Sequence, residues 1–185
     1  MVHRPFRIEG YAIVSEDGML ANAARIIPKS LKFEADQRFF ECGLGQVVAV
    51  VHGRHSQEQQ AQSQMRRRLI LTRQIPSISA DPLNDKALLW NPAGASFEQA
   101  LAALGVLDGT IGIIGGAHVF GIFLDRYDLF HLSRVPHVRL PGGRPVFPDV
   151  PARNPEDVLA SHGLKPGMRK VLDSTNGVTL TSWQR

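Results

Sequence analysis

Two adjacent glycines, Gly115 and Gly116, stand between an apolar run (residues 111–114) and a segment that we expect to be helical (residues 117–124). An apolar run with β-branched residues and no alternation is typical of a strand covered on both faces, as in a parallel sheet. The glycines remove two Cβ atoms, so backbone N–H groups can approach a ligand, and the helix start adds partial positive charge. The pattern fits a site for a phosphate or the edge of a nucleotide, and it fits a tight turn without a ligand equally well.

Polar groups also follow two other predicted strands. Residues 47–51 lead into residues 53–56, which hold a glycine, two basic side chains and a serine, and residues 69–72 end in Thr72 followed by Arg73. Because the carboxyl ends of parallel strands lie at one edge of a sheet, three such ends would form an anion-binding edge long enough for a dinucleotide. Ser56 could instead simply cap a helix. Neither a G-x-G-x-x-G fingerprint after a first strand nor a Walker A motif is present.

One carboxylate lies on the apolar face of a predicted helix. Asp36 follows Phe33 by three residues and precedes Phe40 by four, so the three side chains share a face. A buried carboxylate without a partner would cost on the order of several kcal/mol or would shift its pKa. Asp36 therefore reaches solvent at the edge of the helix, pairs with a distant cation, or meets a polar ligand.

Alternating strands and helices must position these residues. The sequence predicts an α/β fold: a mostly parallel, twisted sheet with flanking helices and an antiparallel C-terminal edge strand, within one domain of residues 1–185. We interpret residues 19–28 and 76–86 as loops. The expected strands are residues 8–14, 47–51, 69–72, 87–90, 111–114, 129–133 and 178–183, and the expected helices are residues 33–41, 57–64, 96–104 (with a capping box at Ser96 and Gln99) and 117–124.

The chain has 185 residues, a formal net charge of +4 and a single cysteine, Cys42. A positive charge suits anionic ligands such as nucleotides. The arginine run at residues 66–68 leaves a nucleic-acid binder open, although residues 57–64 before it contain no aromatic side chain to stack on bases. One cysteine excludes an internal disulfide and favours a reducing, cytoplasmic setting.

Two kinds of partner are not expected. The N-terminus lacks the apolar region of a signal peptide, and no apolar run approaches the roughly 18 residues of a membrane helix, so we expect no membrane partner. His52, His118 and His131 lack the spacing of metal ligands, so we predict no metal site.

Four segments resemble dihydrofolate reductases. Residues 50–56 (V-V-H-G-R-H-S) are similar to the V-I-M-G-R-x-T segment of that family, and residues 68–73 (R-L-I-L-T-R) are similar to its R-x-I-V-L-T-R strand. Residues 113–129 resemble its I-G-G-x-x-V-Y…F-L…D-x-L block, and residues 147–149 resemble its F-P-D. The resemblance covers roughly residues 7–150, and the I-G-G block is its most specific part.

The N-terminal half looks closer to the reductase domain of bifunctional riboflavin-biosynthesis proteins. Residues 15–21 are similar to the S-x-D-G-K-I-A of that group, and residues 36–40 are similar to its D-R-x-F-F. Two features depart from dihydrofolate reductases: their L-P-W loop after the first strand is missing, and His52 replaces the methionine of V-I-M-G-R.

The resemblance implies a dihydrofolate reductase-like fold that binds NADPH. It implies that the Gly115–Gly116 peptide is cis and that Arg73, with Thr72, meets the adenosine 2′-phosphate, which favours NADPH over NADH. The cofactor-binding residues that it implies are Gly53, Arg54, His55, Ser56, Leu71, Thr72, Arg73, Ile114, Gly115, Gly116, Ala117, His118, Val119 and Phe120.

For the substrate, the resemblance implies that the carboxylate of Asp36 is the catalytic group and meets a heterocycle, and we assign Ile13, Phe40 and Ser133 to the same site. The expected function is an NADPH-dependent reductase that transfers a hydride to a small nitrogen heterocycle or a related carbonyl or imine, as in the pyrimidine reductases of riboflavin biosynthesis. The alternatives are dihydrofolate reduction and, in another class, a nucleotide-binding protein without catalysis. The riboflavin-type relatives suggest a homodimer.

Overall fold

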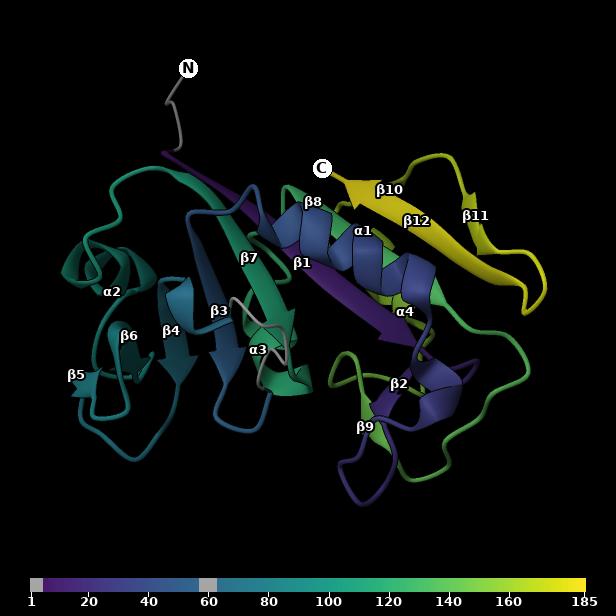
Figure 1. Ribbon diagram of the computed structural model, residues 1–185, viewed down its shortest axis with the longest axis horizontal. Coiled ribbons are helices and arrows are strands. Elements are labelled where there is room, and N and C mark those ends of the chain that lie inside the picture. The colour runs from purple at the N-terminus through teal and green to yellow at the C-terminus, as the bar shows by residue number, and fades with distance from the viewer. Residues whose placement is uncertain (1–4, 57–62) are drawn as a thin grey trace.

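A large mixed sheet runs through the molecule (Figure 1). The computed structural model describes residues 5–56 and 63–185. Within them, ten strands form one sheet with the order β10-β12-β8-β1-β7-β3-β4-β6-β5 and with β11 paired to β12. The strands are β1 (Phe6–Val14), β3 (Ala49–Gly53), β4 (Arg68–Leu71), β5 (Ile78–Asp81), β6 (Asn84–Trp90), β7 (Gly109–Gly115), β8 (Leu129–Arg134), β10 (Lys165–Pro166), β11 (Lys170–Asp173) and β12 (Val178–Gln184).

The centre of the sheet is parallel, as predicted. The strands β8, β1, β7, β3, β4 and β6 pair in parallel with their neighbours. The outer strands β5 and β12 are antiparallel to β6 and β8. The C-terminal strand was expected at the edge of the sheet, but the short strands β10 and β11 pair with its outer side. Two further strands, β2 (Met19–Ala21) and β9 (Arg144–Pro145), form a separate antiparallel pair.

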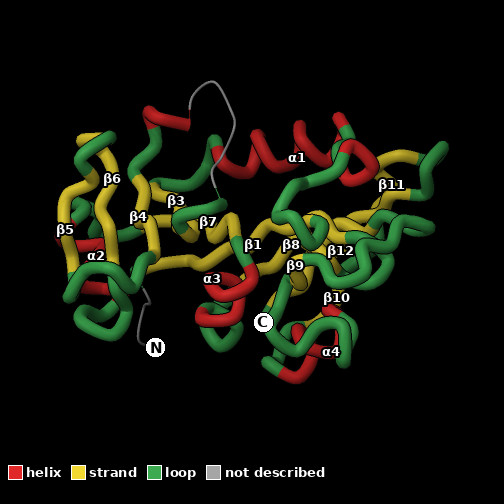
Figure 2. The backbone as a smooth tube through the Cα atoms, turned by 90° about the horizontal axis from the view of Figure 1, so that it is seen from below, coloured by secondary structure: helices red, strands yellow, loops and turns green. Residues whose placement is uncertain are grey.

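Helices cover the sheet on both faces, which gives three layers (Figure 2). Helix α1 (Glu34–Leu44) lies on one face, and α2 (Phe97–Ala103), α3 (Ala117–Ile122) and α4 (Pro155–Ser161) lie on the other. The capping box predicted for α2 is present, since Ser96 and Gln99 exchange both hydrogen bonds. The helix predicted for residues 57–64 falls mostly outside the described residues, and residues 63–65 form a short 3-10 turn.

Stacked aromatic rings fill the core beneath α2 and α3. Phe97 and Phe123 pack edge to face with ring centroids 4.9 Å apart, and Phe130 contacts Phe147 at 5.3 Å. All four side chains are at most 3% exposed. Burial of such rings contributes about 1.5–3 kcal/mol each, so this aromatic layer stabilises the packing of α2 and α3 on the sheet.

Two glycines allow α1 to approach the other face closely. A Cβ atom on Gly43 would lie 2.6 Å from the ring of Tyr11 on β1, and one on Gly112 of β7 would lie 3.3 Å from Leu44. Larger residues at either position would push the helix outward. The close packing fixes the height and the register of α1 over β1, and with them the place of Asp36.

Three segments differ from the sequence predictions. Residues 76–86, interpreted as a loop, contain β5 and the start of β6, which form a hairpin whose turn is closed by Asp81 accepting a hydrogen bond from the Leu83 N–H. Residues 19–28, also interpreted as a loop, contain β2. Helix α4 was not predicted, although Asn154, which caps it by accepting from the N–H of Asp157, and Pro155 are ordinary start signals.

No described helix is long and apolar enough to cross a membrane.

Candidate active site

Three strand ends lie side by side at one edge of the sheet, as predicted. Gly53 at the end of β3 is in register with Leu71 at the end of β4, and on its other side His52 is in register with Gly115 at the end of β7. The arrowheads of the three strands point to the same edge in Figure 1. Ligands of open parallel sheets bind beyond such carboxyl ends.

At this edge β7 ends in two residues without side chains, Gly115 and Gly116, and Ser56 lies next to them. A Cβ atom on Gly116 would lie 3.1 Å from Ser56 Oγ, and one on Gly53 would lie 4.0 Å from the backbone nitrogen of Gly116. The Gly115–Gly116 peptide is cis, as expected, and Gly115 has φ +128°, in a region that side chains rarely adopt. The absence of side chains brings the ends of β3 and β7 close together; Gly115 is buried, and Gly53 and Gly116 are half-buried.

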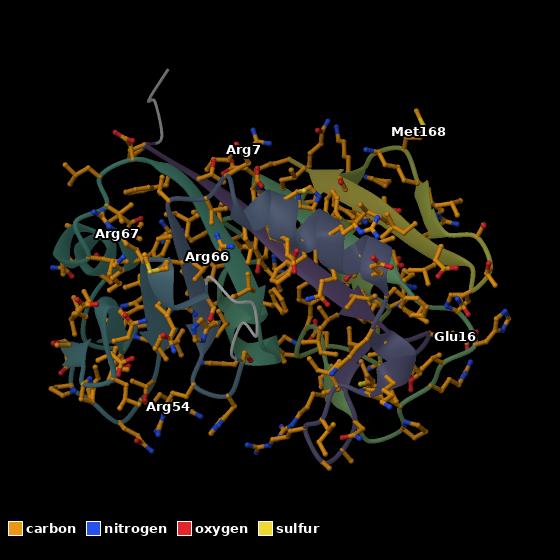
Figure 3. The ribbon with its side chains drawn as sticks, viewed as in Figure 1. Arg7, Glu16, Arg54, Arg66, Arg67 and Met168 are labelled. Atoms are coloured by element: carbon orange, nitrogen blue, oxygen red, sulfur yellow. The ribbon has the colours of Figure 1, made fainter. Side chains whose placement is uncertain are left out.

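The other assigned cofactor residues divide into exposed and buried groups. Arg54, which lies where β3 and β4 end in Figure 3, is exposed. His55, Arg73 and His118 are exposed as well, whereas Ile114 and Ala117 are half-buried. The side chains of Leu71, Thr72, Val119 and Phe120 are buried, so these four would pack beneath the strand ends and would not contact a ligand directly.

The four residues assigned to the substrate come from α1, β1 and β8. The Ser133 hydroxyl lies near enough to the carboxylate of Asp36 to lower its pKa, and Ser133 is the register partner of Ile13 near the end of β1. Phe40, one turn after Asp36, packs on Tyr11 with ring centroids 5.8 Å apart. The structure thus brings the carboxylate, a hydroxyl and apolar side chains together.

Asp36 has an unusual environment for an aspartate. Burial raises the pKa of its carboxyl above the usual value, and the nearby hydroxyl of Ser133 offsets only part of this effect. Asp36 therefore keeps a proton to higher pH than an exposed aspartate does. A carboxyl with a raised pKa is well suited to sharing a proton with a ring nitrogen.

The two groups of residues are neighbours along one edge. The strand order β8-β1-β7-β3-β4 puts the end of β1, with Ile13, between Ser133 on β8 and Gly115 on β7. A ligand held at the ends of β7, β3 and β4 would therefore lie beside one held at the ends of β8 and β1. The arrangement can hold two ligands in contact without any movement of one domain against another.

Behind this site lies a polar cluster that the sequence did not indicate. Tyr11 Oη and Arg7 Nε donate to the carboxylate of Glu9 at 2.8 and 2.7 Å, and His131 Nδ1 lies 2.8 Å from Ser182 Oγ. The ring of His131 also stacks on Tyr11, with centroids 4.7 Å apart. His131, Tyr11 and Ser182 share one face through neighbouring register positions on β8, β1 and β12, a relation that spacing along the chain cannot reveal.

The cluster holds Glu9 ionised. The imidazole of His131 lowers the pKa of Glu9 most, and with Arg7 and Tyr11 it outweighs burial and brings the pKa to about 2. His131 Nε2 is 3.8 Å from the carboxylate, beyond hydrogen-bond reach, so we attribute its effect to charge when it is protonated rather than to a direct bond.

We expect this carboxylate to make stability depend on pH. Glu9 has a usual pKa of 4.5 and a folded pKa of about 2, so its stabilisation is complete above pH 4.5 and is lost as the pH falls toward 2. The difference between the two pKa values corresponds to roughly 3 kcal/mol as an upper limit. Denaturant unfolding of the wild type and of Glu9→Gln at about pH 7 and pH 3 should show a clearly larger pH effect in the wild type than in the variant. Glu34→Gln, which removes an exposed ion pair with Arg38 on α1, should keep the full pH effect.

Two cavities of the described chain lie away from Asp36. One, of about 240 Å³, lies between α3 and α4 and includes His118 and Phe147, and the other, of about 340 Å³, lies at the opposite edge beside Val48 and Arg67. Neither is lined by Asp36 or Ser133, although His118 and Asp149 line the first of them. We therefore locate the candidate site from the arrangement of side chains and not from the size of a cavity.

The arginine run does not form one exposed basic surface. Arg68 is 6% exposed, Arg66 Nη1 donates to the carbonyl of Leu44 at 2.6 Å, and Arg67 Nη1 donates to the carbonyl of Gly105 at 2.8 Å. Arg66 and Arg67 lie at the edge of the sheet opposite Arg54 (Figure 3). These arginines contribute to the fold. Among the residues with described positions, no three His, Cys, Asp or Glu side chains form a group that could hold a metal ion.

This layered α/β architecture, with the strand order given above, is the dihydrofolate reductase-like fold. A candidate riboflavin biosynthesis protein from Shewanella sp. PV-4 superposes with a TM-score of 0.68 at 19% identity, over 97% of this chain and 98% of that one. Dihydrofolate reductase from Enterococcus faecalis, in complex with NADP(H), superposes with a TM-score of 0.64 at 17% identity, over 97% and 96% of the two chains.

A third structure of the same fold is a diaminohydroxyphosphoribosylaminopyrimidine deaminase/5-amino-6-(5-phosphoribosylamino)uracil reductase from Thermotoga maritima. It has a TM-score of 0.64 and 15% identity, and the match covers 98% of this chain and 56% of that one. No protein-family model matches the sequence, and no curated protein matches it significantly. At these identities the structural likeness establishes the fold.

Proposed function

We propose that this protein is a reductase that transfers a hydride from NADPH to a small nitrogen heterocycle or a related carbonyl or imine. The observation that carries the proposal is the adjacency of two sites along one sheet edge. Ser133 near the end of β8 and Ile13 near the end of β1 lie beside Asp36 of α1, and the glycine edge (Gly53, Gly115 and Gly116) lies at the ends of β3 and β7. Hydride transfer needs this adjacency, because donor and acceptor must lie in contact.

The residues at the glycine edge fit a phosphorylated cofactor. Ser56 Oγ and the bare backbone at Gly116 leave a place that a Cβ atom would fill, and the exposed cations Arg54 and Arg73 are available for phosphates. The neighbours add support, since one is named as a complex with NADP(H) and another as a uracil reductase. When bound, NADPH supplies a hydride to the substrate.

The residues of the chain would orient the substrate and share one proton with it. Asp36 would bond an N–H of the heterocycle, and its raised pKa lets it share a proton with the ring and so make the ring carbon more electrophilic. Ser133 would orient this carboxyl, and Ile13 and Phe40 would provide apolar surface for a flat ring. Orientation of this kind supplies much of the rate in hydride transfer.

A substrate panel tests the proposal. We expect NADPH to bind the purified protein and to be oxidised, seen as loss of reduced nicotinamide absorbance, when a ribosylamino-pyrimidinedione or a related heterocycle is added. Oxidation with dihydrofolate alone would assign the protein to dihydrofolate reduction instead. Binding of NADPH without oxidation by any member of the panel would leave a non-catalytic nucleotide-binding protein, and absence of binding would refute the proposal.

Arg73 gives a prediction on cofactor choice. An exposed guanidinium after β4 can form charge-assisted bonds with a 2′-phosphate, so Arg73→Ala should reduce the preference for NADPH over NADH by about tenfold or more. The measurement is the ratio of the two dissociation constants. Arg67→Ala removes the same charge at the opposite edge and should leave this ratio unchanged. Equal ratios in both variants would remove Arg73 from the cofactor site.

A further inference from the structure

A histidine and an arginine are buried together on neighbouring strands next to the glycine edge. His52 on β3 is 2% exposed and Arg68 on β4 is 6% exposed. Val50 is in register with Arg68 and His52 with Ile70, so both side chains lie on the same face of the sheet. The Arg68 Nη1 and His52 Nε2 atoms are 3.0 Å apart.

The partners of the two ring nitrogens determine the tautomer of His52. A guanidinium can only donate, so Nε2 must accept from Arg68 and the ring proton must be on Nδ1. His52 Nδ1 lies 2.8 Å from the carbonyl oxygen of Gly53, and this N–H therefore donates to it. Arg68 thus orients a donor toward the backbone at the end of β3.

The carbonyl of Gly53 is the point where the following turn closes. It also accepts a hydrogen bond of 3.1 Å from the Ser56 N–H. Ser56 in turn lies against Gly116, and His52 is in register with Gly115 across a shift in the pairing of β3 and β7. The imidazole of His52 therefore holds the Gly53 carbonyl that closes the turn after β3. Through Ser56, this turn lies against Gly116 at the end of β7.

Burying this polar pair is costly, and an apolar side chain of similar volume is often neutral or stabilising at such a place. The methionine that the V-I-M-G-R pattern has at this position would make neither hydrogen bond. A gain in stability therefore does not explain the pair, whereas a fixed geometry at the strand end does.

We infer that His52, oriented by Arg68, is a positioning residue that holds the turn of residues 53–56 in the conformation that binds the cofactor. This inference rests on the proposed function, because it assumes that the turn contacts NADPH. It predicts that loss of the bond to Gly53 weakens cofactor binding more than it weakens the fold.

Asparagine and glutamine can separate the two hydrogen bonds of His52. An asparagine amide occupies the place of Nδ1 and can donate to Gly53, whereas a glutamine amide reaches the place of Nε2 and bonds Arg68 instead. The dissociation constant for NADPH should stay within about threefold of the wild type in His52→Asn and rise about fivefold or more in His52→Gln. In His52→Met it should rise about tenfold or more.

Val51→Ala is the matched control. Val51 is on the same strand with its side chain in the core of the opposite face, so its truncation lowers the melting temperature without contact to His52. NADPH affinity should be unchanged in this control variant.

In His52→Gln, turnover at saturating NADPH should stay near that of the wild type. Fluorescence titration gives the dissociation constants, and thermal unfolding without ligand gives the melting temperatures.

Three results would overturn the inference. Equal affinities in His52→Asn and His52→Gln would show that the bond to Gly53 does not matter. An affinity loss in Val51→Ala as large as that in His52→Met would show a general effect of destabilisation. Wild-type protein that does not bind NADPH would overturn the proposed function as well, whereas the first two results leave that function standing.

Discussion

Asp36→Asn should lower turnover about 100-fold or more while the dissociation constant for NADPH changes little. General acid–base groups typically contribute about 10²–10⁴-fold to rate, and an amide cannot share a proton as a carboxyl does. The residues assigned to the cofactor lie at the ends of β7, β3 and β4 and on α3, so the change leaves them intact. The measurements are steady-state turnover with saturating NADPH and a fluorescence titration of the cofactor.

Stability provides a second readout for the same variant. Burial raises the pKa of Asp36, so its ionised form is disfavoured in the folded state and lowers stability at neutral pH. Asparagine removes this charge and keeps a polar group beside Ser133, so the melting temperature should be unchanged or higher. Glu41→Gln, an exposed change on the same helix, should leave both turnover and stability unchanged. Wild-type turnover in Asp36→Asn would exclude Asp36 from the reaction.

Gly115→Ala should lower the affinity for NADPH by about tenfold or more. Gly115 has φ +128°, so a side chain there costs more than about 1–2 kcal/mol unless the backbone moves. A moved backbone would change the end of β7, where the cofactor is expected. An added Cβ would lie 3.5 Å from Phe120, which is an ordinary contact, so the effect comes from the backbone and not from a collision.

The control for this variant is Gly105→Ala. Gly105 has φ +76°, and a Cβ there would lie 3.8 Å from Arg67 Nη1, which is an ordinary contact. Gly105 precedes β7 at the opposite edge of the sheet, where Arg67 donates to its carbonyl, so this variant should lose some stability and keep its affinity for NADPH. Both variants are titrated with NADPH: if Gly105→Ala loses as much affinity as Gly115→Ala, the loss is due to stability alone.

Most of the parallel sheet could be predicted from the sequence, because its strands are short apolar runs followed by glycine or polar residues. The run before Gly115 and the run before Gly53 form neighbouring strands that end at one edge. Asp36 could be singled out because a carboxylate on an apolar helix face is costly. Its pairing with Ser133 on β8 could only be anticipated from the family resemblance, since the two residues are far apart in the chain.

Other parts could not be predicted because pairing between distant strands decides them. Residues 76–86 have the polar composition of a loop, and the pairing of β5 with β6, which itself pairs with β4, makes them part of the sheet. The cluster of Glu9, Tyr11 and His131 depends on the register of β1 and β8. In the same way His52 and Arg68 meet only because β3 and β4 are neighbours.

The position of β8 between β1 and β12 has a consequence for synthesis on the ribosome. Ser133 lies on β8, and the outer side of β8 pairs with residues 178–184, which are translated well after it. Until those residues emerge, the nascent chain displays β8 as an open strand edge, which is prone to pair with other polypeptides. Protection of this strand by a chaperone during translation would thus serve the assembly of the half of the molecule that holds the candidate site.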